Sequence, residues 1–204
     1  MYAYINGFVT DKSENCIILE NNGIGYRIYT DSNTIIKLAY NKETRFYTYL
    51  NIKDDAMELY GFLSNDILSI FKQLISVSGI GPKGALGILS TLQIDELITA
   101  IISEDAKAIA KSPGIGQKTA KKVIIELKDK INPYSSFTDT NEESILNPEG
   151  QNEIKDIKKE AMEALIALGY SKSESYMAIN KIDIDTVTSV EDVLKIALTN
   201  LVRI

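Results

Sequence analysis

The chain has 204 residues, of which 45% are hydrophobic and 25% are charged, a composition typical of globular proteins. Its single cysteine, Cys16, excludes an internal disulfide and favours an intracellular setting. The absence of histidine removes the usual general base near neutral pH and the commonest metal ligand. The N-terminus lacks a secretory signal, and no apolar run approaches the ~18 residues of a membrane span. We therefore expect a soluble, cytoplasmic protein with no metal, no cofactor and no catalytic side chains.

Charge is distributed unevenly along the chain. The net charge is −6 overall, and it divides into −2 for residues 1–63, +2 for residues 64–134 and −6 for residues 135–204. The middle segment is basic because of a lysine cluster, which consists of Lys118, Lys121, Lys122, Lys128 and Lys130. Such a cluster is either a solvated helix face or a surface for nucleic acid, and charge alone does not choose between them.

The first segment predicts several short antiparallel strands. Alternating or β-branched runs occur within residues 2–10, 16–20, 25–30 and 45–52, and turn signals such as Asp31-Ser32-Asn33 separate them. Five or six strands in about 60 residues favour a small closed barrel such as an OB-fold, because closure removes exposed strand edges. A small SH3-like barrel would give much the same pattern.

The remaining segments predict helices. Apolar spacing indicates a helix that begins after Ser64 or Asn65, and further helices over 95–102, 104–111 and 118–131. Residues 135–153 are polar and acidic without sustained periodicity, which predicts a flexible linker, the alternative being one long ordered loop.

Residues 154–204 then indicate three short helices. The first ends at Gly169, the second is capped by Ser171 or Ser173, and the third opens at Ser189. The expected fold is therefore α+β and multidomain. It has a barrel over 1–63, a helical domain over 64–134, a linker over 135–153 and a three-helix bundle over 154–204.

The strongest signal is an internal repeat of a Gly-Ile-Gly turn. Residues 76–85 (SVSGIGPKGA) align with residues 111–120 (KSPGIGQKTA), 35 positions later, and each copy is typical of a helix, a turn and a second helix. Glycine permits a positive φ and leaves room for a ligand, while the second helix presents free N–H groups at its positive end. A lysine follows each second glycine by two residues, where its charge can support a bound phosphate.

Two such turns predict contacts to two phosphates of a nucleic-acid backbone, without readout of base sequence. The residues that we assign to this role are Gly79, Ile80, Gly81, Lys83, Gly84, Gly114, Ile115, Gly116, Lys118, Thr119 and Lys122.

Other interpretations of the repeat are weaker. The spacing of Gly79, Gly81 and Gly84 matches a dinucleotide-binding fingerprint, but a helix rather than a strand precedes it, and the second copy has Thr119 at the third glycine position. No phosphate-binding P-loop pattern is present. The turns could simply join packed helices, although two copies with equivalent lysines weigh against this alternative.

At these residues the chain resembles the RuvA family, subunits of the Holliday junction branch migration complex. The resemblance covers the whole chain. It rests on the paired helix-hairpin-helix motifs and on residues 22–26 (NGIGY), 54–62 (DDAMELYGF) and 164–170 (ALIALGY). It implies an OB-fold, a tandem helix-hairpin-helix domain, a tether and a small helical domain. It also implies a homotetramer or octamer that holds a four-way junction open in recombination and repair, with the RuvB ATPase motor as partner and the RuvC resolvase in the full complex.

The resemblance assigns two further sites. Asp54 and Asp55 align with an acidic pin at the junction crossover, where their charge would repel phosphates, although two acids in a turn are usually just solvated. The acidic C-terminal unit would bind the motor rather than DNA, the alternative being a merely stabilising bundle. The candidate contacts to the motor, some of which must be core residues, are Leu165, Leu168, Tyr170 and Leu198.

Two departures and two rival functions remain. The basic residues of the helical domain are all lysines, and Gly84 and Gly87 soften the helix after the first turn by about 1 kcal/mol each relative to alanine, which bears on the strength of the first phosphate site. A nuclease or glycosylase would need a metal-binding carboxylate cluster or a pocket for a flipped base, and Asp54-Asp55 is the only candidate pair. A nucleic-acid-free adaptor would not bind a junction even at low salt.

Overall fold

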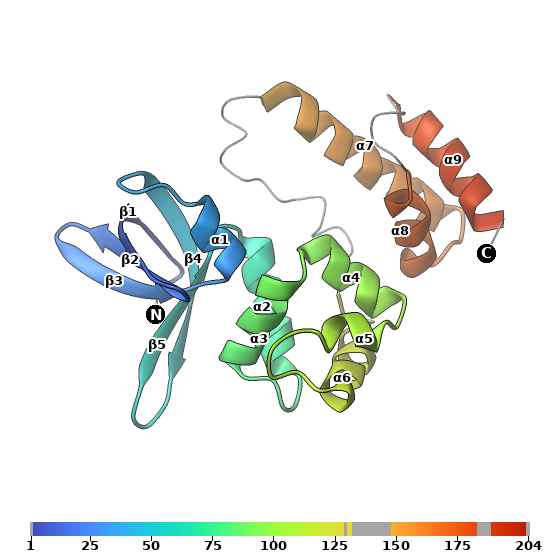
Figure 1. The fold of residues 1–204 in the computed structure, drawn as a ribbon. Coiled ribbons are helices and arrows are strands. Elements are labelled where there is room, and N and C mark those ends of the chain that lie inside the picture. The colour runs from blue at the N-terminus through green and yellow to red at the C-terminus, as the bar shows by residue number, and fades with distance from the viewer. Residues whose placement is uncertain (1, 129, 132–147, 183–188, 203–204) are drawn as a thin grey trace. The chain divides into compact units, whose positions relative to one another are not determined.

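The computed structural model describes residues 2–128, 130–131, 148–182 and 189–202. The chain divides into two compact units, Met1–Ile131 and Asn132–Ile204, which are treated separately below (Figure 1). The part of the expected linker up to residue 147 lies outside the described residues.

The first unit begins with five strands that close into a barrel in the order β1-β2-β3-β5-β4. Neighbouring strands are antiparallel, apart from β3 and β5, which are parallel. This is the five-stranded barrel of an OB-fold, so the predicted fold class is confirmed. The strands are β1 (Tyr4–Lys12), β2 (Cys16–Asn21), β3 (Ile24–Tyr29), β4 (Glu43–Ile52) and β5 (Met57–Phe62).

Alternation along the strands builds the core of the barrel. On β1, Ile5 and Val9 are buried, whereas Tyr4 and Phe8 are about half exposed. The apolar side chains that point inward form one cluster with the short helix α1 (Ser32–Lys37), and its members are Ile5, Val9, Ile17, Leu19, Ile28, Ile35, Leu38, Phe46 and Leu59.

Helix α1 corrects the turn expected at residues 31–33. The carboxylate of Asp31 accepts hydrogen bonds from the Thr34 N–H (2.9 Å) and from the Thr34 hydroxyl (2.7 Å), so Asp31 is the N-cap of a helix. Asp, Ser and Asn are favoured both in turns and at helix N-caps, which is why the sequence pattern did not distinguish the two.

Five helices follow the barrel in the first unit. They are α2 (Asn65–Ser76), α3 (Pro82–Thr91), α4 (Ile94–Ile102), α5 (Ala106–Ile109) and α6 (Gln117–Leu127). Ser64 rather than Asn65 is the N-cap of α2, since its Oγ accepts from the Ile67 N–H at 3.2 Å.

Helices α5 and α6 are both shorter than predicted. Asp105 caps α5, which therefore starts two residues later than residue 104. Helix α6 ends at Leu127 rather than near residue 131, with Lys128 as its C-cap. The Lys130 N–H then bonds to the Leu127 carbonyl three residues back, the tighter spacing common at helix ends.

Helices α2 and α3 are tied to the barrel at two places. The ring of Phe71 on α2 lies 5.4 Å from the ring of Tyr60 and 4.8 Å from that of Phe62, measured between centroids. At the other tie, the side-chain amide of Asn33 donates to the Ser90 carbonyl at the end of α3 (3.2 Å). These contacts fix the first Gly-Ile-Gly turn relative to the barrel.

The described residues of the second unit form the helices α7 (Pro148–Ala167), α8 (Lys172–Asn180) and α9 (Val190–Val202). Helix α7 begins at Pro148, five residues before the expected end of the linker at residue 153. Proline suits the first helical position, where its missing N–H has no partner to lose. Helix α7 ends at Ala167, and Gly169 follows two residues later with a φ of +99°, as expected of the residue that terminates the helix. The N-cap of α8 is Ser171.

Within the described residues, no single helix is both long and apolar enough to cross a membrane. One pair, α3 with α4, passes the same criteria of length and composition together, but the two helices are bent by 100° at their junction.

Candidate nucleic-acid interface

The two Gly-Ile-Gly turns repeat the same main-chain hydrogen bonds. In the first turn the Ile80 N–H donates to the Val77 carbonyl at 3.0 Å, and in the second the Ile115 N–H donates to the Ser112 carbonyl at 3.1 Å. The bond that closes the first turn of the following helix is also repeated, at 3.0 and 2.9 Å, from Ala85 to Gly81 and from Ala120 to Gly116. The predicted duplication is therefore structural as well as sequential.

The glycines of each turn serve two different purposes. Gly79 and Gly114 have φ values of +96° and +76°, the left-handed region in which other residues are strained. Gly81 and Gly116 have ordinary φ values of −92° and −81°, and a Cβ at either position would meet nothing within 4 Å. The fold does not demand glycine at these second positions. Glycine there keeps open the space in front of a helix N-terminus.

Helices α3 and α6 both begin at the residue directly after these second glycines. Gly81 and Gly116 are the N-caps, and neither helix has a side-chain capping bond. The first four N–H groups of a helix have no partner within it, so α6 presents four donors to its open end. Helix α3 presents three, because Pro82 at its first position has no N–H. Both ends are suited to an anion, and α6 has the larger set of donors.

The two turns pack on one another through α3. Ile80 and Ile115 are buried, and a Cβ built at Gly84 would lie 3.7 Å from the Ile80 side chain and 3.5 Å from that of Ile115. A Cβ at Gly87 would lie 3.4 Å from the Pro113 carbonyl oxygen. The glycines that soften α3 therefore sit where the second turn approaches the helix. Ile80 and Ile115 anchor the turns, which leaves only their main chains available to a ligand.

The lysines predicted to support phosphates are at the surface. Lys83, Lys118 and Lys122 are exposed, and Thr119 is partly buried. Neither Lys118 nor Lys122 forms an ion pair within the described part of the chain.

One lysine of the predicted cluster is engaged within the protein. The Lys128 ammonium lies 2.5 Å from a carboxylate oxygen of Glu104, and this hydrogen-bonded pair lowers the pKa of Glu104. It joins the turn after α4 to the end of α6, so Lys128 is less available to an external anion.

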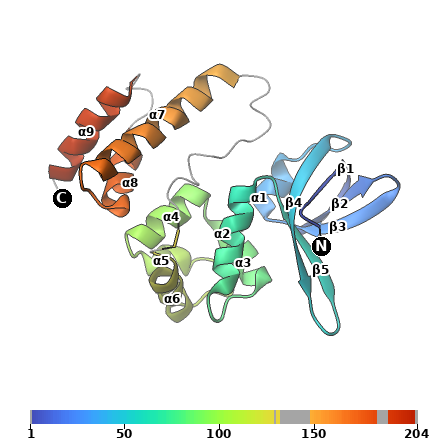
Figure 2. The ribbon, with the colours of Figure 1, turned by 180° about the vertical axis from the view of Figure 1, so that it is seen from behind.

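Asp54 and Asp55 form the tip of the hairpin between β4 and β5. The Lys53 N–H donates to the Ala56 carbonyl at 2.8 Å and closes the loop. Both aspartates are exposed. The hairpin projects beyond the other strands of the barrel, and its tip lies at the same end of the unit as the α2–α3 turn (Figures 1 and 2).

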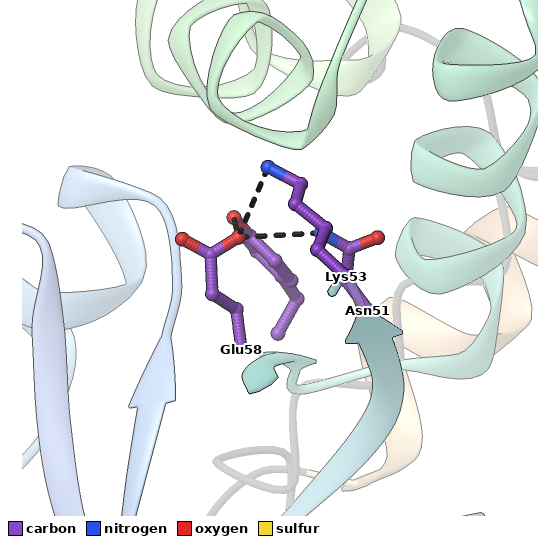
Figure 3. A network of polar contacts seen from close by, with 4 residues as sticks. Asn51, Lys53 and Glu58 are labelled. Atoms are coloured by element: carbon purple, nitrogen blue, oxygen red, sulfur yellow. Dashed lines mark hydrogen bonds and ion pairs between the residues drawn. The ribbon is translucent and has the colours of Figure 1, made fainter. Parts of the chain in front are cut away.

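A third acid on this hairpin, Glu58, was missed by the sequence analysis. One of its carboxylate oxygens accepts hydrogen bonds from the Tyr60 hydroxyl (3.0 Å) and the Asn51 side-chain amide (3.2 Å), and lies 3.9 Å from the Lys53 ammonium (Figure 3). The hydrogen bonds of Tyr60 and Asn51, with the charges of Lys53 and Lys83, keep the pKa of Glu58 below its ordinary value despite partial burial. Burial and this carboxylate in turn raise the pKa of Tyr60.

The predicted motor contacts in the second unit fall into two groups. Leu165 is fully buried in the core of that unit, so it is one of the candidates that belong to the core. Leu168 is 65% exposed, and Tyr170 and Leu198 are partly buried. The apolar spacing of a helix does not separate its core positions from positions at its edge.

The described residues contain no group of three or more His, Cys, Asp or Glu side chains that could hold a metal ion. Asp54 and Asp55 have no third ligand beside them in that set.

Three family models match the chain in succession. They are the RuvA N terminal domain over residues 1–61, a SAM-like Helix-hairpin-helix tandem over 71–129 and the RuvA C-terminal domain over 156–202. The chain is 43% identical over 208 residues to the Holliday junction branch migration complex subunit RuvA of Lachnospira eligens, and the alignment covers all of both chains. The chain belongs to the RuvA family.

Two further RuvA subunits support this membership. The RuvA of Alkaliphilus metalliredigens is 41% identical over 203 residues, and that of Thermoanaerobacter sp. (strain X514) is 39% identical over 204, both with complete coverage. The resemblance drawn from the Gly-Ile-Gly repeat and the three-part order is thereby confirmed.

Proposed function

We propose that this RuvA-family chain binds four-way DNA junctions by their structure rather than their sequence. It holds the junction open and loads the RuvB ATPase for branch migration in recombination and repair. The observation that carries the proposal is the pair of equivalent turns, each with an open glycine in front of unoccupied helical N–H groups. Two equivalent anion sites in one domain suit two phosphates of a nucleic-acid backbone.

In this proposal the main chain of each turn supplies most of the phosphate contacts. The N–H groups around Gly79–Gly84 and Gly114–Thr119 donate to phosphate oxygens, and Lys83, Lys118 and Lys122 add positive charge. These contacts read no bases, so the affinity should fall steeply with salt.

Asp54 and Asp55 are proposed to act at the crossover of the junction. Their exposed position at the tip of a projecting hairpin supports this role. A homotetramer, or an octamer, would gather several such tips at one point, where their negative charge keeps phosphates apart and guides strands into new duplexes.

The chain itself is proposed to be a non-catalytic, cytoplasmic subunit. ATP hydrolysis belongs to RuvB, and RuvC joins the complex as the resolvase. The C-terminal unit would bind the motor through exposed apolar residues such as Leu168. No cofactor is required.

The test is a gel-shift titration of the purified chain against a four-way junction and a linear duplex of equal length, repeated across a range of salt. We expect a strong preference for the junction and a steep loss of affinity with salt. Equal binding to both would reduce the chain to a general binder of duplex DNA, and absence of binding at low salt would favour an adaptor. Cleavage of either DNA in the presence of Mg²⁺ would contradict the non-catalytic role.

A further inference from the structure

Glu58 differs from the other two acids of the hairpin in being held in place. Asp54 and Asp55 are exposed at the tip, whereas the Glu58 side chain is 17% exposed on the stem. It lies directly opposite Asn51 in the register of β4 and β5, and both Asn51 and Tyr60 donate to the same carboxylate oxygen. With two donors on one oxygen, the carboxylate cannot swing away without leaving two polar groups unpaired.

Lys53 is the residue that this fixed carboxylate holds. Lys53 comes immediately before Asp54, and its ammonium is 3.9 Å from Glu58 while its side chain is 55% exposed. Residues 51, 53, 58 and 60 lie on one face of the hairpin, because side chains alternate along each strand. Figure 3 shows the Lys53 ammonium directed toward the carboxylate of Glu58.

A lysine at this position has other partners within reach of its flexible stem. It could fold over the tip and neutralise Asp54 or Asp55, or it could extend to a phosphate of a bound strand. Either change would make the hairpin less repulsive to DNA. The pairing with Glu58 disfavours both alternatives, because the Lys53 ammonium already has an anionic partner within the protein.

We propose that Glu58 is a positioning residue, which holds the Lys53 ammonium on the stem of the β4–β5 hairpin and thereby withholds it from phosphate and from the acidic tip. The inference rests on the proposed function, since it concerns how the hairpin meets junction DNA. The carboxylate stays charged at neutral pH, because its pKa is lowered by the hydrogen bonds from Tyr60 and Asn51.

The test is a double-mutant cycle of Glu58→Gln and Lys53→Gln in the full chain, measured as junction affinity across salt. Glutamine at 58 keeps an acceptor for Tyr60 and removes the charge. We expect Glu58→Gln to tighten binding by about two- to fivefold, the range of an exposed ion pair. It should also steepen the salt dependence by about 0.9 per lysine that reaches a phosphate. In the Lys53→Gln background the same substitution should change neither quantity.

Two controls separate this role from simpler ones. Glu14→Gln removes one exposed carboxylate from the β1–β2 turn and should leave the salt dependence unchanged. An equal effect of Glu58→Gln with and without Lys53 would overturn the inference, because Glu58 would then repel phosphate directly. A change in thermal stability without any change in salt dependence would also overturn it.

A readout without DNA distinguishes failure of this inference from failure of the proposed function. The rate at which an amine-reactive acylating reagent labels Lys53 should rise several-fold in Glu58→Gln relative to Glu14→Gln, since the ammonium is no longer held. If the wild-type chain shows no preference for a junction, the proposed function fails while the labelling result still decides whether Glu58 holds Lys53. An unchanged labelling rate would overturn the inference.

Discussion

The two helix-hairpin-helix motifs have turns of the same main-chain conformation but differ in their free N–H donors and in their nearby lysines. Their turns have matching hydrogen bonds and matching open glycines. Helix α3, however, begins with Pro82 and has three free N–H groups, whereas α6 has four. Helix α6 also carries Lys121 and Lys122 soon after Lys118, while Lys83 has no such neighbours in its own helix.

The ion pairs of the described residues do not separate the two motifs, since neither Lys83 nor Lys118 forms one. Lys83 makes only the smallest of the contributions that lower the pKa of Glu58. The difference between the motifs lies in the N–H donors and in the additional lysines of α6. A duplicated anion-binding turn can thus acquire two strengths without a change in its backbone, and we expect the second motif to bind phosphate more strongly.

The largest expected effect comes from filling the open space at each helix start. Gly116→Ser should cap α6 with its own hydroxyl, which raises the free energy of unfolding by a few tenths of a kcal/mol. The same hydroxyl takes the N–H groups that phosphate would use, so junction affinity should fall about tenfold or more, the value of a charge-assisted hydrogen bond. Gel-shift titration and thermal unfolding of the same preparations measure both effects.

Gly81→Ser provides the matched comparison in the first motif. Its loss of junction affinity should be smaller than that of Gly116→Ser, because α3 has fewer donors to lose. Equal losses would show that the two motifs contribute alike, and loss of stability in either variant would contradict the conclusion that the fold does not need these glycines.

A smaller effect is expected from removing one lysine at a time. Lys118→Gln should weaken junction binding several-fold and reduce the slope of log affinity against log salt by about 1 for each phosphate that is no longer neutralised. Lys83→Gln should have a weaker effect on both, because α3 offers fewer N–H donors to the phosphate that Lys83 would support. Affinities at four or more salt concentrations measure the slopes, and a larger effect of Lys83→Gln would reverse the ranking of the motifs.

Neutralising the acidic tip of the β4–β5 hairpin should have a smaller effect on junction affinity. Replacing Asp54 and Asp55 together by Asn should tighten junction binding by a few-fold, since two exposed charges at about 4 Å are worth only about 1 kcal/mol in water. It should also reduce the preference for a junction over a linear duplex and impair branch migration by the assembled complex. Unchanged affinity and unchanged migration would count against a role for the tip at the crossover.

The sequence predicted those features that depend on local residue types. Glycines and lysines repeated at a fixed spacing were enough to locate both turns, and alternation was enough to predict the barrel. Glu58 could not be found in this way, because its role depends on the cross-strand register that places it opposite Asn51. Leu165 lies on α7 and Leu168 directly follows its last residue, yet one is buried and the other exposed, a difference set by tertiary packing.

The N-cap residue Asp31 shows that local residue types can also be ambiguous. Asp31 has the residue type of a turn and of an N-cap, and only its bonds to Thr34 decide between them. Local chemistry therefore predicts that the chain changes direction at residue 31, but not that a helix follows.

The smallest expected effect is on the pH dependence of stability, to which the Glu58 carboxylate contributes. The folded-state pKa of Glu58 is lowered from 4.5, first by Tyr60 and Asn51 and then by Lys53 and Lys83. Its charged form therefore stabilises the fold above pH 4.5, and that stabilisation is lost as the pH falls through the lowered value. Glu58→Gln should reduce stability at pH 7 by no more than about 1 kcal/mol, with the difference from wild type vanishing in acid.

Tyr60→Phe removes the largest cause of the lowered pKa of Glu58 and should reduce the same pH dependence, whereas Glu14→Gln should not. Thermal unfolding between pH 3 and 7 measures all three variants. A constant difference between Glu58→Gln and wild type across this range would mean that the carboxylate acts through packing and not through its charge.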